Sequence, residues 1–127
     1  MNIERLPTNP TTGFSDTVTA VGPGRLIHVA GNVGFGADGK VVPGGLGAEA
    51  KATFDNIERA LEQAGAGMSH VVKINAFVTS LDEYPDYAAV RAERFGETLP
   101  ASATVQVAGL LAGAQIEIDA IAFVPAT

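Results

Sequence analysis

The last quarter of the chain constrains the fold most strongly. Residues 99–124 contain two runs, 101–108 and 116–123, whose side chains alternate between two faces as they do in β-strands. A short connection rich in glycine, alanine and leucine separates the runs. The second run places Glu117 and Asp119 on one face of an otherwise apolar strand. Because a buried carboxylate without a partner is costly, we expect both to face solvent, a partner chain or a binding site.

The preceding residues predict two helices and further strands. Apolar residues recur every three or four positions in Leu46–Ala64, which predicts an amphipathic helix that Gly65 would end. A second helix is predicted from a capping box at Ser80 and Glu83 to about Phe95. Further strands are predicted at 2–6, 17–21, 25–32 and 70–80. This order predicts an α+β fold with both helices on one face of a single mixed sheet.

Length and composition limit the function. The 127 residues suit a single domain, which we place at 1–127. The net charge is −6 and the Lys and Arg residues form no run, so we expect no nucleic acid partner. The chain has no cysteine and no ligand-spaced histidine or carboxylate cluster, so we expect no metal. No apolar run resembles a signal peptide or a membrane span, which favours a cytoplasmic protein with no membrane partner.

The two C-terminal strands also predict association. The runs 101–108 and 116–123 carry apolar residues on both faces. Two helices on one side of the sheet cover only one of these faces. We therefore expect the other face to be buried in an obligate oligomer.

Several short motifs resemble those of one protein family. They are Gly13-Phe14-Ser15-Asp16, His28-Val29-Ala30-Gly31-Asn32, Asp55-Asn56-Ile57 with Leu61, Ala64 and Gly65, Val71-Val72-Lys73, Pro100-Ala101-Ser102-Ala103, and the run from Ile116 to Ala122. Their order over nearly the whole chain resembles the RidA family of reactive-intermediate deaminases, also called the YjgF type and formerly endoribonuclease L-PSP. The resemblance implies a chorismate-mutase-like fold and a homotrimer with small-molecule clefts between subunits.

The resemblance also implies roles for particular residues. Glu117 stands where the family has its water-positioning glutamate, and no cofactor is implied. The Gly31 backbone and the hydroxyls of Ser102 and Thr104 would orient the substrate, with Phe14 as an apolar wall. From the residues alone, the alternative for Glu117 is an interfacial carboxylate satisfied by backbone amides, and the alternative for Ser102 is a plain strand hydroxyl.

The chain departs from the family at several of these positions. Ser102 stands where the deaminases have an arginine that grips the substrate carboxylate. Without the paired hydrogen bonds of that arginine, the affinity for a 2-imino acid would fall by about two to four orders of magnitude. The other departures are Phe14 for tyrosine, Ala30 for serine, Ala88 for asparagine and Thr104 for cysteine. The cleft would therefore be less polar, which fits either a more apolar substrate or no turnover, while the missing arginine argues against standard 2-imino acid deamination.

Arg91 offers a compensation for the missing arginine. It follows Ala88 by three residues, so both lie on one face of the second predicted helix. A long side chain there could bring a cation into the cleft from another wall. The alternative is an ordinary helix arginine in solvent.

Two functions fit these observations. The first is a cofactor-free hydrolase or deaminase of a small imine, enamine or related metabolite in clefts between subunits. The second is a non-catalytic trimer that binds a small metabolite or acts as a chaperone. The sequence leaves open whether the chain is an enzyme.

Overall fold

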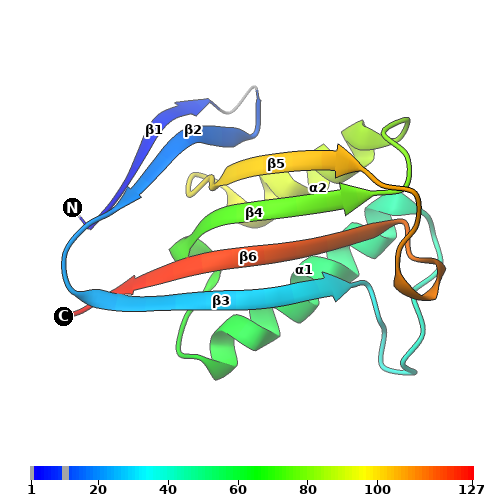
Figure 1. Ribbon diagram of the computed structural model, residues 1–127, viewed down its shortest axis with the longest axis horizontal. Coiled ribbons are helices and arrows are strands. Elements are labelled where there is room, and N and C mark those ends of the chain that lie inside the picture. Colours follow the sequence, from blue (N-terminus) through cyan, green and yellow to red (C-terminus); the bar gives the residue numbers. More distant parts are fainter. Residues whose placement is uncertain (1, 10–11) are drawn as a thin grey trace.

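The computed structural model describes residues 2–9 and 12–127 (Figure 1). Its strands are β1 (Ile3–Asn9), β2 (Phe14–Ala20), β3 (Gly24–Val33), β4 (Val71–Val78), β5 (Ala101–Gln106) and β6 (Ile116–Pro125), and its α-helices are α1 (Leu46–Gln63) and α2 (Tyr84–Phe95). Neither helix in this part of the chain is long and apolar enough to cross a membrane.

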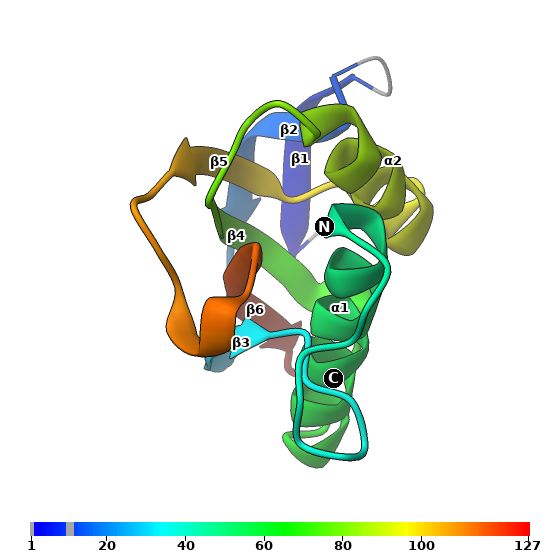
Figure 2. The same ribbon diagram turned by 90° about the vertical axis from the view of Figure 1, so that its right-hand side faces the viewer.

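The main sheet has four strands in the order β3-β6-β4-β5. Strand β6 runs antiparallel to both neighbours, whereas β4 and β5 are parallel, so the sheet is mixed. Both helices lie on one side of it, and the other side is open (Figures 1 and 2). The predicted α+β fold with two helices on one face of a mixed sheet is confirmed.

The first two strands correct the prediction of a single sheet. Strands β1 and β2 pair only with each other, beside the start of β5 (Figure 1). The Ser15 amide donates to the Pro100 carbonyl at 3.0 Å, and the Ser15 hydroxyl donates to the Leu99 carbonyl at 2.7 Å. Pro100 has no N–H to donate in return. These two bonds are therefore not extended into regular strand pairing between β2 and β5.

Helix α1 forms where the apolar periodicity predicted it. Its buried stripe includes Ala50, Phe54, Ile57 and Leu61, and Gly65 follows the helix with φ +79°. Glu49 lies off the predicted stripe, yet it is only 4% exposed. Its carboxylate accepts hydrogen bonds from the Gln115 backbone amide at 2.8 Å and side-chain amide at 2.9 Å, which compensate its burial.

The predicted capping box at the start of the second helix is wrong. The Ser80 hydroxyl accepts from the Asp82 amide at 3.1 Å instead of the Glu83 amide. A turn in which the Tyr84 amide donates to the Leu81 carbonyl delays the helix. Glu83 is therefore the N-cap residue, without a side-chain capping bond, and Pro85 stands in the first turn.

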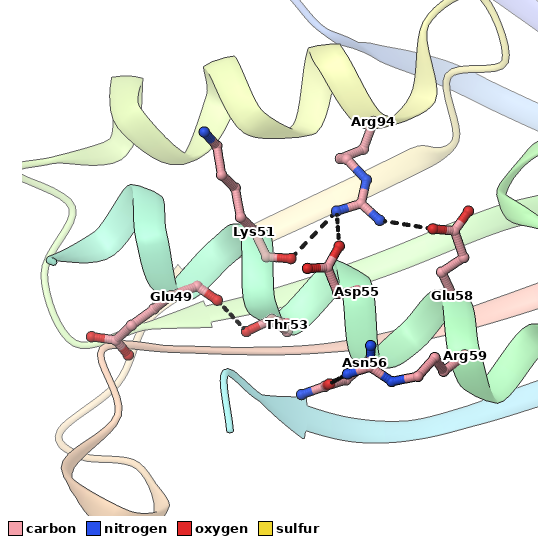
Figure 3. Close-up of polar contacts among 8 residues, drawn as sticks. All are labelled: Glu49, Lys51, Thr53, Asp55, Asn56, Glu58, Arg59 and Arg94. Carbon is pink, nitrogen blue, oxygen red and sulfur yellow. Dashed lines mark hydrogen bonds and ion pairs between the residues drawn. The ribbon is translucent and has the colours of Figure 1, made fainter. Parts of the chain in front are cut away.

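The core lies between the helices and the sheet. Ile116, Ile118, Ala120 and Ala122 of β6 are buried there, whereas the alternate residues Glu117 and Asp119 face the open side. This confirms the predicted alternation. Helices α1 and α2 are joined at their outer side by Arg94, whose guanidinium bonds Asp55, Glu58 and the Lys51 carbonyl (Figure 3).

Candidate functional site

Glu117 projects from the centre of the open sheet face. It is opposite Phe77 on β4 and Val33 on β3 in the strand register. It is half-buried, and no hydrogen bond or ion pair joins its carboxylate to another residue of 2–9 or 12–127. Its neighbour Asp119 differs, because Asp119 accepts from the Asn75 side-chain amide at 2.9 Å. On β6, the Asp119 carboxylate is therefore hydrogen-bonded, whereas the Glu117 carboxylate has no bond to a described residue.

Gly31 gives the Glu117 side chain room to lie over the β3 backbone. A Cβ at Gly31 would lie 2.8 Å from Glu117 Oε2 and 3.1 Å from its Cδ, so any larger residue would have to displace the carboxylate. Strand β3 carries a bulge between Val29 and Asn32 at this point. Ala30 and Gly31 both lie in the bulge and both are exposed. Bulges of this kind re-aim backbone and side chains near sites.

A second group of residues lies near β5 on the helix side of the sheet. We call it the arginine pocket: Phe14, Tyr84, Tyr87, Arg91 and Ser102. The Arg91 side chain is only 1% exposed. Its guanidinium carbon lies 5.3 Å from the Tyr87 ring centre and 5.7 Å from each of the Phe14 and Tyr84 ring centres. The alternative of a solvated helix arginine is therefore wrong.

The bonds of Arg91 go to neutral groups. Its Nη2 donates to the Thr12 carbonyl at 3.0 Å and to the Tyr84 hydroxyl at 3.1 Å. In the described part of the chain, Arg91 Nε, the Tyr87 hydroxyl and the Ser102 hydroxyl are buried without a hydrogen-bond partner. Burial raises the pKa of the Tyr87 phenol, and the nearby Arg91 charge and Ser102 hydroxyl oppose that rise. The pocket thus holds a cation and three unbonded polar atoms.

Gly13 closes the pocket from the β1–β2 side. Its φ is +80°, and a Cβ there would lie 3.0 Å from Arg91 Nη2. A side chain at this position would require the guanidinium to shift by a few tenths of an ångström. Glycine is therefore needed here for both backbone conformation and space.

Within one chain, the candidate residues form two separate groups. Gly31 and Glu117 lie together, and Phe14, Arg91 and Ser102 lie together. Ser102 pairs with the buried Ile74, so it shares the helix side of the sheet, whereas Glu117 lies on the open side.

Thr104 and Ala88 are half-buried on the helix side. Thr104 is two residues beyond Ser102 on the same strand face, and Ala88 is on α2. Ala30 belongs with Gly31 in the β3 bulge. The site predicted from the sequence is thus divided between two faces of the sheet.

Two residues of the arginine pocket were missed by the sequence analysis. Tyr84 and Tyr87 precede Arg91 by seven and four residues on α2. Residues four or seven apart lie on one helix face, so this spacing could have identified both rings.

Other features offer less chemistry. An open depression of about 640 Å³ lies between Pro23, Gly24 and Arg25 and the chain end at 124–127, far along the strands from Glu117. Arg25 is the only titratable side chain lining it. Within residues 2–9 and 12–127 there is no group of three or more His, Cys, Asp or Glu side chains suited to a metal.

Comparison with known proteins agrees with the fold. The chain matches the family model described as endoribonuclease L-PSP over residues 6–124. It is 36% identical over 99 residues to 2-iminobutanoate/2-iminopropanoate deaminase of Bos taurus, an alignment that covers 77% of this chain and 72% of that one.

Solved structures are similar over most of the chain. A protein of unknown function of the conserved Rid protein family from Yersinia pestis superposes with a TM-score of 0.79 at 30% identity, covering 96% of this chain and 98% of that one. E. coli TdcF with bound serine superposes with a TM-score of 0.73 at 25% identity, covering 84% and 91% respectively.

Proposed function

Because the chain belongs to the endoribonuclease L-PSP family, which includes the RidA deaminases, we propose that it is a cofactor-free hydrolase of small imines. The proposal rests on the environment of the Glu117 carboxylate. Glu117 is half-buried, and its carboxylate lies against Gly31 and is bonded to no described residue. A carboxylate in that position can accept a proton from a water molecule held against it.

The proposed step is the hydrolysis of a C=N bond. Water adds to the imine carbon while Glu117 accepts one of its protons, and the electron pair of the C=N bond moves to nitrogen. Glu117 returns that proton to the nitrogen, which gives a neutral carbinolamine. The hydroxyl proton then passes to the nitrogen as the C=O bond forms and the C–N bond breaks, so the nitrogen leaves as ammonia. Imine and water thus become a carbonyl compound and ammonia, with no redox change.

A complete cleft would need more than one copy of the chain. Glu117 and Ser102 lie on opposite faces of one sheet, so a neighbouring copy would have to bring the second group of residues to the first. The open face offers an apolar surface for this contact, since Leu26 is 61% exposed and Val105 47% exposed. We propose a homotrimer, with Phe14, Ser102, Thr104 and Ala88 of one copy lining the cleft at Gly31 and Glu117 of another.

The relatives support a small metabolite as substrate. The Bos taurus relative is a deaminase of 2-iminobutanoate and 2-iminopropanoate. The E. coli TdcF structure holds serine, an amino acid of similar size. All three compounds are small and carry a carboxylate. We place the substrate of this chain in the same size class.

The test uses an amino-acid oxidase to generate 2-imino acids and semicarbazide to trap whatever imine remains. The wild-type protein should lower the trapped imine, and Glu117→Gln should reduce the catalysed rate by about 10²- to 10⁴-fold. Asp119→Asn is the matched control on the same strand face, and it should keep the rate within about threefold of wild type because Asp119 is already bonded to Asn75. Light scattering on the same sample should give three times the 13.0 kDa chain mass.

Two results would count against the proposal. A wild-type protein that leaves the trapped imine unchanged is not a 2-imino acid hydrolase, and an active Glu117→Gln variant removes Glu117 from the step. Binding of 2-oxo acids without any turnover would instead favour a non-catalytic metabolite-binding trimer. What favours this second function is Ser102, because a neutral hydroxyl at this position cannot form an ion pair with a substrate carboxylate.

A further inference from the structure

Glu49 is a buried carboxylate without a cation beside it. It is 4% exposed, and no ion pair of the described residues includes it. Its two bonds to Gln115 compensate the burial, but both donors are neutral. A buried charge held in this way gains no stability over a well-packed apolar side chain. Stability therefore does not explain why α1 carries a glutamate at this position.

The two bonds of Glu49 fix one residue in two ways. Oε1 accepts from the Gln115 backbone amide at 2.8 Å, and Oε2 accepts from its side-chain amide at 2.9 Å. The Gln115 carbonyl in turn accepts from the Thr79 amide at 3.1 Å, which joins the same residue to the end of β4. Gln115 lies directly before β6 and two residues before Glu117. The contact with Glu49 thus sets where β6 begins.

Helix α1 also holds the end of β3. The Asn56 side-chain amide donates to the Val33 carbonyl at 3.2 Å, and a Cβ at Gly34 would lie 2.7 Å from the Glu49 carbonyl oxygen. Glu49 and Asn56 are seven residues apart, so they leave one face of α1 (Figure 3). This face anchors β6 just before Glu117, and it anchors β3 at Val33, which pairs with Glu117.

Such anchors matter because the strand pairing is interrupted beside Glu117. The bulge between Val29 and Asn32 leaves Gly31 outside the regular pairing of β3 with β6. Beyond the bulge only two residue pairs join the strands, the last of them Val33 with Glu117. Yet a Cβ at Gly31 would lie only 2.8 Å from Glu117 Oε2. This close fit depends on how the ends of β3 and β6 lie against each other, and both ends are bound to α1.

We propose that Glu49 is a positioning residue for Glu117: by fixing the start of β6 to α1, it keeps the Glu117 carboxylate against the Gly31 backbone. Glu49 acts from the helix side of the sheet, whereas Glu117 lies on the open side. The inference rests on the proposed function only for the statement that Glu117 is the group that acts on water. The anchoring itself concerns the protein without ligand.

The experiment compares Glu49→Leu with Glu49→Gln in the imine-trapping assay and in crystal structures without ligand. Glu49→Leu removes both bonds and keeps an apolar bulk, so it should lower kcat by about 10- to 100-fold with KM within about twofold. Its urea midpoint should stay near that of wild type, because the buried charge is removed together with its bonds.

Glu49→Gln tests for rescue by a conservative change. Its carbonyl oxygen can still accept from the Gln115 backbone amide, and the Gln115 side chain can turn its own oxygen toward the introduced amide. This variant should keep kcat within about threefold of wild type. In the crystal structures, the Glu117 carboxylate should leave Gly31 in Glu49→Leu and stay against it in Glu49→Gln.

Leu61→Ala is the control for a merely structural effect. Leu61 is buried near the other end of α1, so the variant should lower the urea midpoint but leave kcat within about twofold of wild type. Should Glu49→Leu fail to fold, Gln115→Ala replaces it. Gln115 is half-buried and would lose only its side-chain bond to Glu49, so kcat should fall by about 3- to 10-fold.

Three outcomes would overturn the inference: an unchanged kcat in Glu49→Leu, a loss that Glu49→Gln does not rescue, or a Glu117 carboxylate that stays against Gly31 in the Glu49→Leu structure. With a wild-type protein that hydrolyses imines, each of them removes this inference and leaves the proposed function in place. A wild-type protein without hydrolysis, together with a displaced carboxylate in Glu49→Leu, keeps the positioning role and removes the proposed function.

Discussion

Two arginines one turn apart on α2 have opposite environments. The Arg94 side chain is 18% exposed and bonds two carboxylates, Asp55 at 2.7 Å and Glu58 at 3.1 Å (Figure 3). The Arg91 side chain is 1% exposed, and it bonds a carbonyl and a phenol. Water could have satisfied Arg94 without either carboxylate. Arg91, which most needs an anion, has none in the described part of the chain.

The comparison separates an arginine that joins two helices through ion pairs from one that is buried and forms no ion pair with a described residue. An exposed ion pair contributes up to about 1 kcal/mol and is screened by salt. A buried, unpaired guanidinium destabilises the empty protein, and natural folds accept such a conflict mainly at functional sites. Around Arg94, charge and exposure are matched by two ion pairs, whereas around Arg91 a buried charge has no ionic partner among the described residues.

The strongest way to break the comparison is to crowd Arg91. Gly13→Ala should lower the free energy of unfolding by about 2–3 kcal/mol, because it strains a backbone with φ +80° and requires Nη2 to shift by a few tenths of an ångström relative to its two acceptors. Gly39→Ala is the matched control, with φ +77° and no atom within 4 Å of the new Cβ. It should cost only the backbone strain of about 1–2 kcal/mol.

Urea denaturation at one fixed protein concentration measures both variants, since stability of an oligomer depends on concentration. The excess loss in Gly13→Ala over Gly39→Ala reports the contact with Arg91. Equal losses would mean that Arg91 shifts freely and that its bonds to Thr12 and Tyr84 contribute little.

A second change sharpens the comparison at Tyr87. Because its buried hydroxyl lacks a partner among the described residues, Tyr87→Phe should raise the free energy of unfolding by about 1 kcal/mol at neutral pH in the absence of ligand. Removing an acid from around Arg94 should do the opposite, because those groups are bonded.

The pH dependence of the same variant follows from the raised pKa of Tyr87. The folded protein keeps the phenolic proton to higher pH than the unfolded chain, whose tyrosines titrate near 10. This contribution to stability is full below pH 10 and is lost above it, by up to about 1.4 kcal/mol per pH unit, until the folded pKa is reached. Tyr87→Phe should flatten that loss in denaturation curves from pH 9 upward, and an unchanged slope would contradict a buried neutral phenol.

The smallest effect is expected at Arg94. Asp55→Asn combined with Glu58→Gln should lower the free energy of unfolding by about 0.5–1 kcal/mol, because both ion pairs are partly exposed. The difference should shrink as salt is raised from about 0.1 to 1 M. A loss of several kcal/mol that persists at high salt would contradict this reading, because it would mean that these carboxylates act as buried partners of Arg94.

Most of the secondary structure could be predicted because it depends on the spacing of residues close together in the sequence. The three- and four-residue spacing of Ala50, Phe54, Ile57 and Leu61 gave α1, and the alternation around Glu117 gave β6 with its two faces. The capping box failed because Ser80 has a competing local partner, the amide of Asp82. The burial of Glu49 does not follow from local spacing, because its partner Gln115 is 66 positions away.

The candidate site was harder to predict because it depends on how residues of neighbouring strands pair across the sheet. The sequence identified Glu117, Gly31 and Ser102 as residues of interest, but alternation alone does not say which strand face meets the helices. The pairing of Ser102 with Ile74 placed the serine beneath α2, away from Glu117.

The sequence by itself determined the secondary structure, the two-faced character of the C-terminal strands and the family, since these follow from local spacing and short motifs. Only the tertiary structure decided that Arg91 is buried among three rings, that Gly13 leaves room for it and that the hydroxyls of Tyr87 and Ser102 lack hydrogen-bond partners among residues 2–9 and 12–127. The physical reason is that burial and electrostatic pairing depend on atoms brought together from distant parts of the chain. Helical spacing could place Tyr84, Tyr87 and Arg91 on one face, but it could not tell solvent from core.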